Sequence, residues 1–287
     1  MSGNSINTAR PVFQSEVIET YKWIELNILP LLKLNSNDAS PIGSFGKKLE
    51  NATSGDIDVA ILMNKLSENN EVSLDNVLDW LDEKLKSLGY STKVARGFCQ
   101  VSFGAPINGN WENGTVQVDL MLSMSLEWSN FMYYSPNFKI GESKYKGLYR
   151  NILLMNIISE MNREISKRTE HNEIEQYKQN VVRLDKGLFS VEKTFMGKKG
   201  LVKMASLMRD QDKFITNVPD VVVKMAFGEN VNVIDTMTFE SIWNLFISPS
   251  FKHKDKFDKI LKRFISGINS TKMPLPVEIQ SYMISLN

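Results

Sequence analysis

The sequence predicts an α/β (α+β) protein, in which an N-terminal lobe of strands and helices is followed by a mainly helical C-terminal lobe. Two observations carry this prediction. Short β-branched runs alternate with stretches of helical periodicity in the first part of the chain, whereas from Pro219 onwards the apolar residues recur at helical spacing. With 287 residues, of which 42% are hydrophobic, the chain is long enough to form two lobes.

Composition excludes several classes of protein and site. Cys99 is the one cysteine, so an internal disulfide is excluded, and with two histidines a Cys/His zinc site is not credible. Any metal ion must therefore be held by oxygen. The net charge of +1 does not by itself indicate nucleic-acid binding. Because we find neither an apolar leader nor a run of about 18 apolar residues, we expect a soluble, cytoplasmic protein without a membrane partner.

The N-terminal elements follow from apolar spacing and from turn residues. The first helical stripe bends or ends near Pro30, and the second begins at Ser73, a good N-cap, and ends before Gly89. Alternating or β-branched runs indicate strands on either side of the second helix. We expect, in order, a helix over 17–32, a strand over 56–63, a helix over 74–88, and strands over 98–103 and 115–123.

The C-terminal elements are less regular. Residues 127–147 are rich in aromatic residues and lysine without clear periodicity, and residues 148–161 form an almost wholly apolar helix. A hairpin is predicted around Asp185–Gly187, within about 181–195, and the segments after Pro219 read as helices.

Two aspartates one residue apart open the first core strand. In a strand, residues two apart point to the same side, so Asp56 and Asp58 project together while Ile57 and Val59 face the opposite layer. Two bare carboxylates at that spacing repel each other. They make physical sense as joint ligands of a hard cation such as Mg²⁺, which prefers carboxylate, phosphate and water oxygens.

Asp119 offers a third carboxylate, because it lies in "VQVDLML" on the face opposite Val118 and Leu120. A solvated surface turn would account for Asp56 and Asp58 but not for an acid inside this strand. Upstream, Gly43 and Ser44 supply a tight turn that can approach a phosphate. The next two charged residues, Lys47 and Lys48, can neutralise its charge or simply be solvated.

These motifs resemble the nucleotidyltransferase superfamily with the DNA polymerase beta-like fold. The residues that carry the resemblance are "GSF", then "SGDID" eleven residues later, and the distant "VDLML"; it covers residues 14 to 125. The stretches "GKK…SGDID" and "SKYKGLYRN" are also similar to nucleotidyltransferase-like proteins of bacteriophages, which would place the protein in a host cytoplasm. Only about one helix fits before Gly43, so a helix-hairpin-helix segment is missing, which argues against a templated repair polymerase.

The resemblance implies a fold, a reaction and roles for residues. It implies a small mixed sheet with helices on one side, a catalytic domain over 1–126, and a mainly helical domain over 127–287. The implied reaction is Mg²⁺-dependent transfer of an NMP from an NTP to an acceptor hydroxyl, with release of pyrophosphate. Two Mg²⁺ ions are implied, with Mn²⁺ as the alternative. The implied roles are metal binding for Asp56, Asp58 and Asp119, hydroxyl activation for Asp119, and nucleotide binding for Gly43, Ser44, Lys47 and Lys48.

The acceptor stays open at this point. An RNA or DNA 3′ end, used without a template, is favoured by basic and aromatic residues interleaved over 144–150, and by basic segments at 193–200 and 251–264. Each of these segments can also be an ordinary solvated loop or helix face, and for residues 251–264 the solvated helix face is the preferred interpretation. The alternatives are nucleotidylation of a protein or small molecule, and a degenerate fold used as a binding or virion module.

Overall fold

The computed structural model describes residues 5–166, 174–196 and 208–285. They belong to two compact units. The first comprises Met1–Gly147, Leu184–Gly187 and Asn217–Pro219, and the second comprises Leu148–Arg183, Leu188–Thr216 and Asp220–Asn287. The domain division expected at residue 126 stays a prediction. No helix within the described ranges is long and apolar enough to span a membrane.

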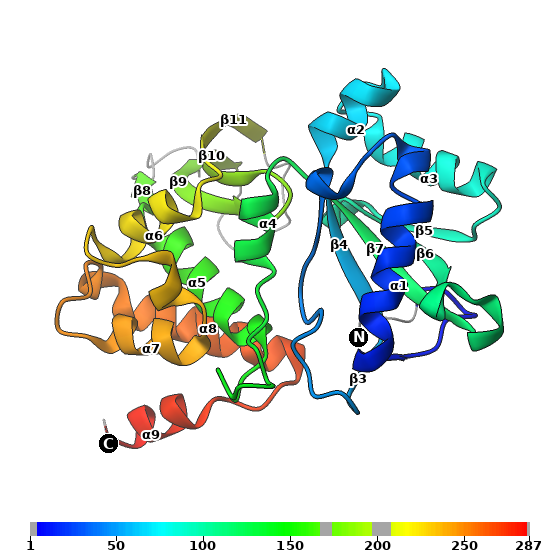
Figure 1. The fold of residues 1–287 in the computed structure, drawn as a ribbon. Helices are drawn as coiled ribbons and strands as arrows, with labels where there is room; N and C mark the ends of the chain where they lie inside the picture. Colours follow the sequence, from blue (N-terminus) through cyan, green and yellow to red (C-terminus); the bar gives the residue numbers. More distant parts are fainter. Residues whose placement is uncertain (1–4, 167–173, 197–207, 286–287) are drawn as a thin grey trace. The chain divides into compact units, whose positions relative to one another are not determined.

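The first unit is built on a five-stranded mixed sheet with the strand order β2-β4-β7-β6-β5 (Figure 1). Its two central strands, β4 and β7, run parallel, and the other neighbours are antiparallel. The small mixed sheet implied by the resemblance is therefore confirmed. The strands are β2 (Ala39–Pro41), β4 (Asp56–Leu62), β5 (Thr92–Ala95), β6 (Gln100–Pro106) and β7 (Thr115–Ser123).

One face of this sheet is covered by α1 (Gln14–Asn27) and α3 (Val77–Ser87), as Figure 1 shows. The alternating apolar residues of the strands point into this layer, where Ile57, Val59 and Ile61 of β4 are buried. A short helix, α2 (Met63–Asn70), follows β4 directly. On the opposite face, α4 (Leu126–Met132) packs against β2 and β4. The expectation of helices on one side of the sheet is thus wrong, because a second apolar cluster, formed by Ile42, Ala60 and Met121, requires cover there.

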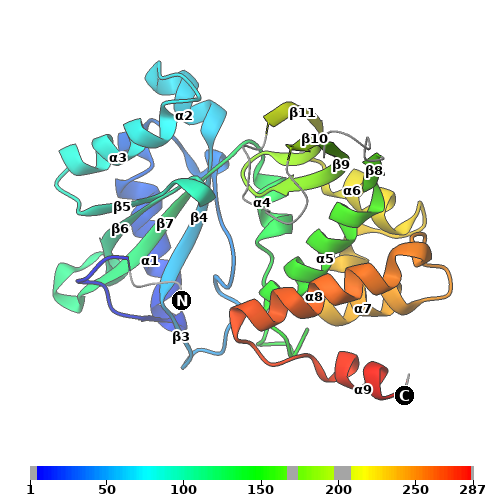
Figure 2. The ribbon, with the colours of Figure 1, turned by 180° about the vertical axis from the view of Figure 1, so that it is seen from behind.

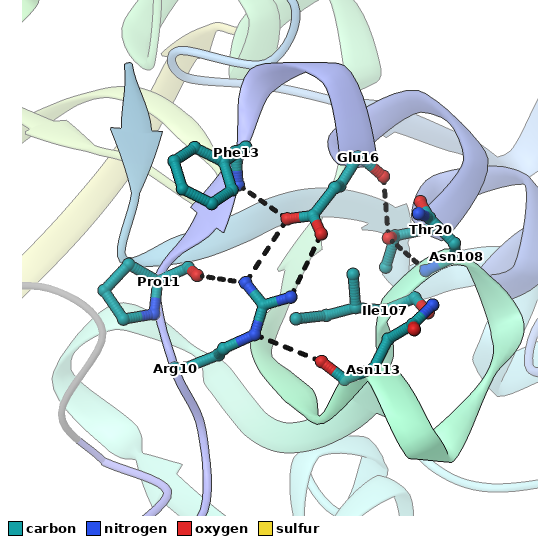
Figure 3. Close-up of polar contacts among 8 residues, drawn as sticks. All are labelled: Arg10, Pro11, Phe13, Glu16, Thr20, Ile107, Asn108 and Asn113. Atoms are coloured by element: carbon teal, nitrogen blue, oxygen red, sulfur yellow. Dashed lines mark hydrogen bonds and ion pairs between the residues drawn. The ribbon is translucent and has the colours of Figure 1, made fainter. Parts of the chain in front are cut away.

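The N-terminal segment is attached to α1 and to the connection between β6 and β7 by a polar network (Figure 3). The Arg10 guanidinium donates to both carboxylate oxygens of Glu16 and, through Nε, to the Asn113 carbonyl at 3.1 Å. Glu16 also accepts from the backbone N–H of Phe13 at 2.9 Å, which caps the start of α1. Here β1 (Val12–Phe13) pairs with β3 (Thr53–Ser54), so the residues just before the acidic strand are fixed as well.

The second unit combines a four-stranded sheet with helices, and the mainly helical C-terminal region is confirmed. The predicted hairpin forms from β9 (Ile174–Arg183) and β10 (Gly187–Met196), and two further strands extend it to the order β11-β10-β9-β8. Figure 2 shows α8 running alongside α5. The remaining elements are β8 (Glu164–Ser166), β11 (Met208–Thr216), α5 (Gly147–Met161), α6 (Pro219–Phe227), α7 (Phe239–Ile247), α8 (Phe257–Thr271) and α9 (Val277–Ser285).

Candidate metal and nucleotide site

Three carboxylates converge on the face of the sheet opposite α1. In the parallel register of β4 and β7, Asp58 lies beside Asp119, and Asp56 lies beside Gln117. Since side chains alternate between the two faces, all four project to the same side. One carboxylate oxygen from each of Asp56, Asp58 and Asp119 lies within 4.8 Å of the others. The structure therefore brings together the three acids that the sequence singles out.

The acids are packed closely enough to perturb one another. Burial, followed by the charges of Asp56 and Asp119, raises the pKa of Asp58 well above its usual range. Burial also raises the pKa of Asp119, whose side chain is 4% exposed, although hydrogen bonds from Ser102 and Gln117 oppose the rise. Three negative charges at this spacing are unfavourable unless a proton or a cation offsets them. An all-oxygen donor set of this kind suits a hard divalent cation, so the residues present fit Mg²⁺.

Gly43 meets the carboxylate of Asp58 directly. Its φ of +66° lies in the left-handed region, and a Cβ built on it would stand 2.7 Å from Oδ2 of Asp58. The turn is held on both sides, because Ile42 donates its N–H to the Asp58 carbonyl at 3.0 Å and Gly43 bridges to the backbone of Tyr134. Only glycine allows the backbone to approach the acid this closely.

Next to this turn lies a small pocket whose polar lining comes from Ser44, Ser54, Asp56 and Asp58. Ser54 is buried and connects its neighbours. Its hydroxyl lies 3.4 Å from Oγ of Ser44 and accepts hydrogen bonds from Nζ of Lys48 and Nε2 of Gln14, each at 2.9 Å. The sequence analysis did not name Ser54, although its place two residues before Asp56 was a usable signal.

The two neighbouring lysines point to different places. Lys48 Nζ also donates to the Thr53 carbonyl at 2.9 Å. Burial lowers the pKa of Lys48, Asp56 lies near enough to oppose that change, and the charge of Lys146 adds to it. Lys47 instead donates to the Ser135 carbonyl at 2.9 Å, and its Nζ stands 3.9 Å from the centre of the Tyr134 ring. The structure therefore brings Lys48 to the acids and engages Lys47 with the 134–135 segment.

Two residues of the basic and aromatic segment are structural. Arg150 is fully buried and donates through Nε to the Thr236 carbonyl at 2.6 Å, and the hydroxyl of Tyr149 donates to the Pro274 carbonyl at 2.8 Å. The expected nucleic-acid surface over 144–150 is therefore wrong for these two side chains, which belong to the interior of the second unit. Lys144 and Lys146 are exposed.

Several basic side chains in α8 and just before it make contacts inside the second unit. Lys259 and Arg263 both pair with the fully buried Glu160 of α5, and Lys256 donates to the Met161 carbonyl at 3.0 Å. These contacts favour the structural interpretation of residues 251–264. The remaining basic segment is 193–200, of which residues 197–200 and the side chains of 193–196 lie outside the described residues.

Comparisons with known proteins give a partial likeness to solved structures. No protein-family model and no curated protein matches the chain. A structure of the Cid1 RNA terminal uridylyl transferase is 17% identical with a TM-score of 0.29, and the match covers 51% of this chain and 40% of that one. A Cid1 poly(U) polymerase structure is 14% identical (TM-score 0.27; 52% and 50% covered). A cytoplasmic RNA terminal U-transferase is 12% identical (TM-score 0.29; 57% and 59% covered). The chain thus spans about half the length of these proteins, and a likeness of this size transfers no activity to it.

Proposed function

We propose that the protein is a Mg²⁺-dependent nucleotidyltransferase of the polymerase beta-like superfamily, with its catalytic domain over residues 1–126. It transfers an NMP from an NTP to an acceptor hydroxyl and releases pyrophosphate. The observation that carries the proposal is the meeting of Asp56, Asp58 and Asp119 within 4.8 Å, beside a glycine turn that abuts one of them. The bacteriophage origin and the cytoplasmic location stay predictions.

Asp56, Asp58 and Asp119 would hold the metal ions. A pair of Mg²⁺ ions bound by carboxylates stabilises the charge that develops on the attacking and leaving oxygens of an in-line phosphoryl transfer. We assign Asp119 the further role of accepting the proton of the attacking hydroxyl. The support is position, because the Asp119 carboxylate lies among the acids that would hold the metal ions, within reach of a hydroxyl brought to them.

The turn at residues 43–48 would hold the triphosphate. We assign the backbone of Gly43 and the hydroxyl of Ser44 to hydrogen bonding with phosphate oxygens, and Lys48 to neutralising their charge. The lowered pKa of Lys48 reflects its burial beside the acids. Its ammonium is thus already partly desolvated, so an arriving polyanion would bind it without the full cost of removing its water. Lys47 would support the turn through its hydrogen bond to the Ser135 carbonyl.

We propose a nucleic-acid 3′ end as the acceptor, used without a template. The support is local charge. Lys146 is exposed and lies close enough to Lys48 to lower its pKa, and Lys144 is exposed beside it. A protein or a small molecule is the alternative acceptor.

The test is incubation with each α-labelled NTP and Mg²⁺, with RNA, DNA or a protein extract as acceptor. Loss of one metal-binding carboxylate should remove several kcal/mol of transition-state stabilisation, a fall of about 1,000-fold or more in rate. We therefore expect Asp56→Ala, Asp58→Ala and Asp119→Ala to lose label transfer, while Asp75→Ala, which alters an exposed aspartate, retains it. Equal transfer by all four variants would overturn the proposal. Label on a protein band or on a small product would show that the acceptor is a protein or a small molecule and not a nucleic acid.

A further inference from the structure

A buried glutamine connects the N-terminal segment to one of the three acids. Gln117 lies in β7, two residues before Asp119 and on the same face, and is 2% exposed. Its Nε2 donates to Oδ1 of Asp119 at 2.9 Å, and its Oε1 accepts the backbone N–H of Ser5 at 2.8 Å. Both polar ends of the amide are therefore used, one on the chain's N-terminal segment and one on the acid.

A second donor reaches Asp119 from the neighbouring strand. Ser102 of β6 lies directly beside Asp119 in the antiparallel register and hydrogen-bonds to its carboxylate. Gln100, on the same strand, donates in turn to the Ser102 hydroxyl at 3.0 Å. Asp119 is thus held from two sides by neutral donors, both of which are buried.

This arrangement does more than satisfy a buried group. Two residues further along the same face of β7, Met121 is buried in an apolar cluster with Ile42 and Ala60, so this face of the sheet accommodates an unbranched apolar side chain. Hydrogen bonds to a carboxylate oxygen fix the rotation of the carboxylate, and so decide which lone pairs face Asp56 and Asp58. An acid that has to bind a metal ion and accept a proton needs that rotation to be fixed.

We propose that Gln117 is a positioning residue for Asp119, and that the Ser5 N–H holds Gln117 in the orientation that presents its amide to the acid. The proposal rests on the proposed function for its kinetic consequences. Its metal-binding consequence can be measured without any nucleotide. Residues at the start of the chain thereby become part of the machinery that orients the third acid.

The variants separate the two hydrogen bonds. Gln117→Met keeps the length of the side chain and removes both its donor and its acceptor. Ser5→Pro removes the N–H that holds the glutamine, because proline has none, although its ring also fixes φ at this position. Ser5→Ala, which keeps that N–H, is the control for loss of the serine side chain. Asp119→Asn marks the effect of losing the acid's charge. Each protein is titrated with Mn²⁺ by calorimetry in the absence of NTP, its thermal midpoint is recorded, and kcat and KM are then measured.

We expect Gln117→Met to bind Mn²⁺ about 10-fold more weakly and to lose about 10- to 100-fold in kcat, with KM for the NTP within about twofold of wild type. Ser5→Pro should lose about threefold in both metal affinity and kcat, while Ser5→Ala matches wild type. A merely structural glutamine would lower the thermal midpoint and leave Mn²⁺ affinity and kcat unchanged at a temperature where the variant is folded, and that result would overturn the proposal.

The failures of the two proposals can be told apart. If wild type binds Mn²⁺ but transfers no label to any acceptor, the proposed function is wrong. The role of Gln117 is then judged on the Mn²⁺ affinity of its variants alone. If Gln117→Met does not fold, Ser5→Pro decides, and equal Mn²⁺ affinity of Ser5→Pro and Ser5→Ala refutes the positioning role. If wild type binds no Mn²⁺, both proposals are wrong.

Discussion

Gly43→Ala offers the sharpest test of the site, because Gly46 supplies a matched control in the same turn. Both glycines have nearly the same left-handed backbone, with φ of +66° and +65°. A Cβ on Gly46 would meet nothing within 4 Å, whereas a Cβ on Gly43 would stand 2.7 Å from Oδ2 of Asp58. The difference between the two alanine variants therefore isolates the contact with the acid from the cost of the backbone conformation.

The magnitudes follow from this geometry. An alanine in the left-handed region costs about 1–2 kcal/mol, so each variant should lower the thermal midpoint by roughly 2–8 °C. In Gly43→Ala, the Asp58 carboxylate must also retreat by roughly half an ångström or more to restore van der Waals separation. A displacement approaching 1 Å at a reacting centre costs about 100-fold in rate. We therefore expect Gly43→Ala to transfer NMP about 10- to 100-fold more slowly than Gly46→Ala.

The assay is label transfer from an α-labelled NTP under single-turnover conditions, with Mn²⁺ titration of the nucleotide-free proteins beside it. Single-turnover rates separate chemistry from product release. Weaker Mn²⁺ binding by Gly43→Ala alone would support the displacement of Asp58. If the two variants transfer label at the same rate and bind Mn²⁺ equally, the close approach of Gly43 to Asp58 has no part in catalysis and the reasoning is refuted.

Three further outcomes are expected. Lys48→Ala should raise KM for the NTP about 10-fold or more. Lys47→Ala should leave KM within about twofold of wild type, because the Lys47 ammonium is bonded to the 134–135 segment. Steady-state kinetics at varied NTP concentration measures both. Because the pKa of Asp58 is raised in the folded protein, its contribution to stability is complete below the usual carboxyl pKa of about 3.9 and is lost as pH rises through the raised pKa. The thermal midpoint of metal-free wild type should therefore fall, relative to that of Asp58→Asn, as pH rises between these two pKa values. Parallel plots of thermal midpoint against pH would contradict this. Glu16→Ala should lower the free energy of unfolding by about 1–2 kcal/mol in urea titrations without changing kcat, since the Glu16 carboxylate caps α1 and pairs with Arg10 and has no assigned role in the site. A change in kcat at constant stability would count against this.

The alternation of side chains along a strand explains why the cluster of three acids could be predicted from the sequence. In a strand, alternation assigns each residue to a face without any knowledge of its partners, so Asp56, Asp58 and Asp119 could be placed opposite the buried Ile57 and Val118. The same logic was available for Gln117, which lies two residues before Asp119. It was missed because a neutral amide in a strand gives no signal of chemistry until its hydrogen bonds are seen.

Side chains with distant partners could not be predicted. Lys47 and Lys48 are adjacent and chemically identical, and their partners Ser135 and Ser54 distinguish them in the folded chain but not in the sequence. Arg150 resembles a nucleic-acid contact in the sequence, yet it is buried because its acceptor, the Thr236 carbonyl, comes from a distant part of the chain. Long side chains in irregular segments follow such non-local contacts, which local periodicity does not encode.

The parallel neighbours β4 and β7 also bear on how a chain emerging from the ribosome acquires its site. Asp56 and Asp58 are synthesised well before Asp119, with α2, α3, β5 and β6 between them. Domains fold as units during synthesis, and pairing of distant strands comes late. An incomplete chain that ends before β7 carries Asp56 and Asp58 but lacks Asp119 and the parallel neighbour of β4. The cluster of three acids therefore forms only once β7 has paired with β4, late in the synthesis of this unit.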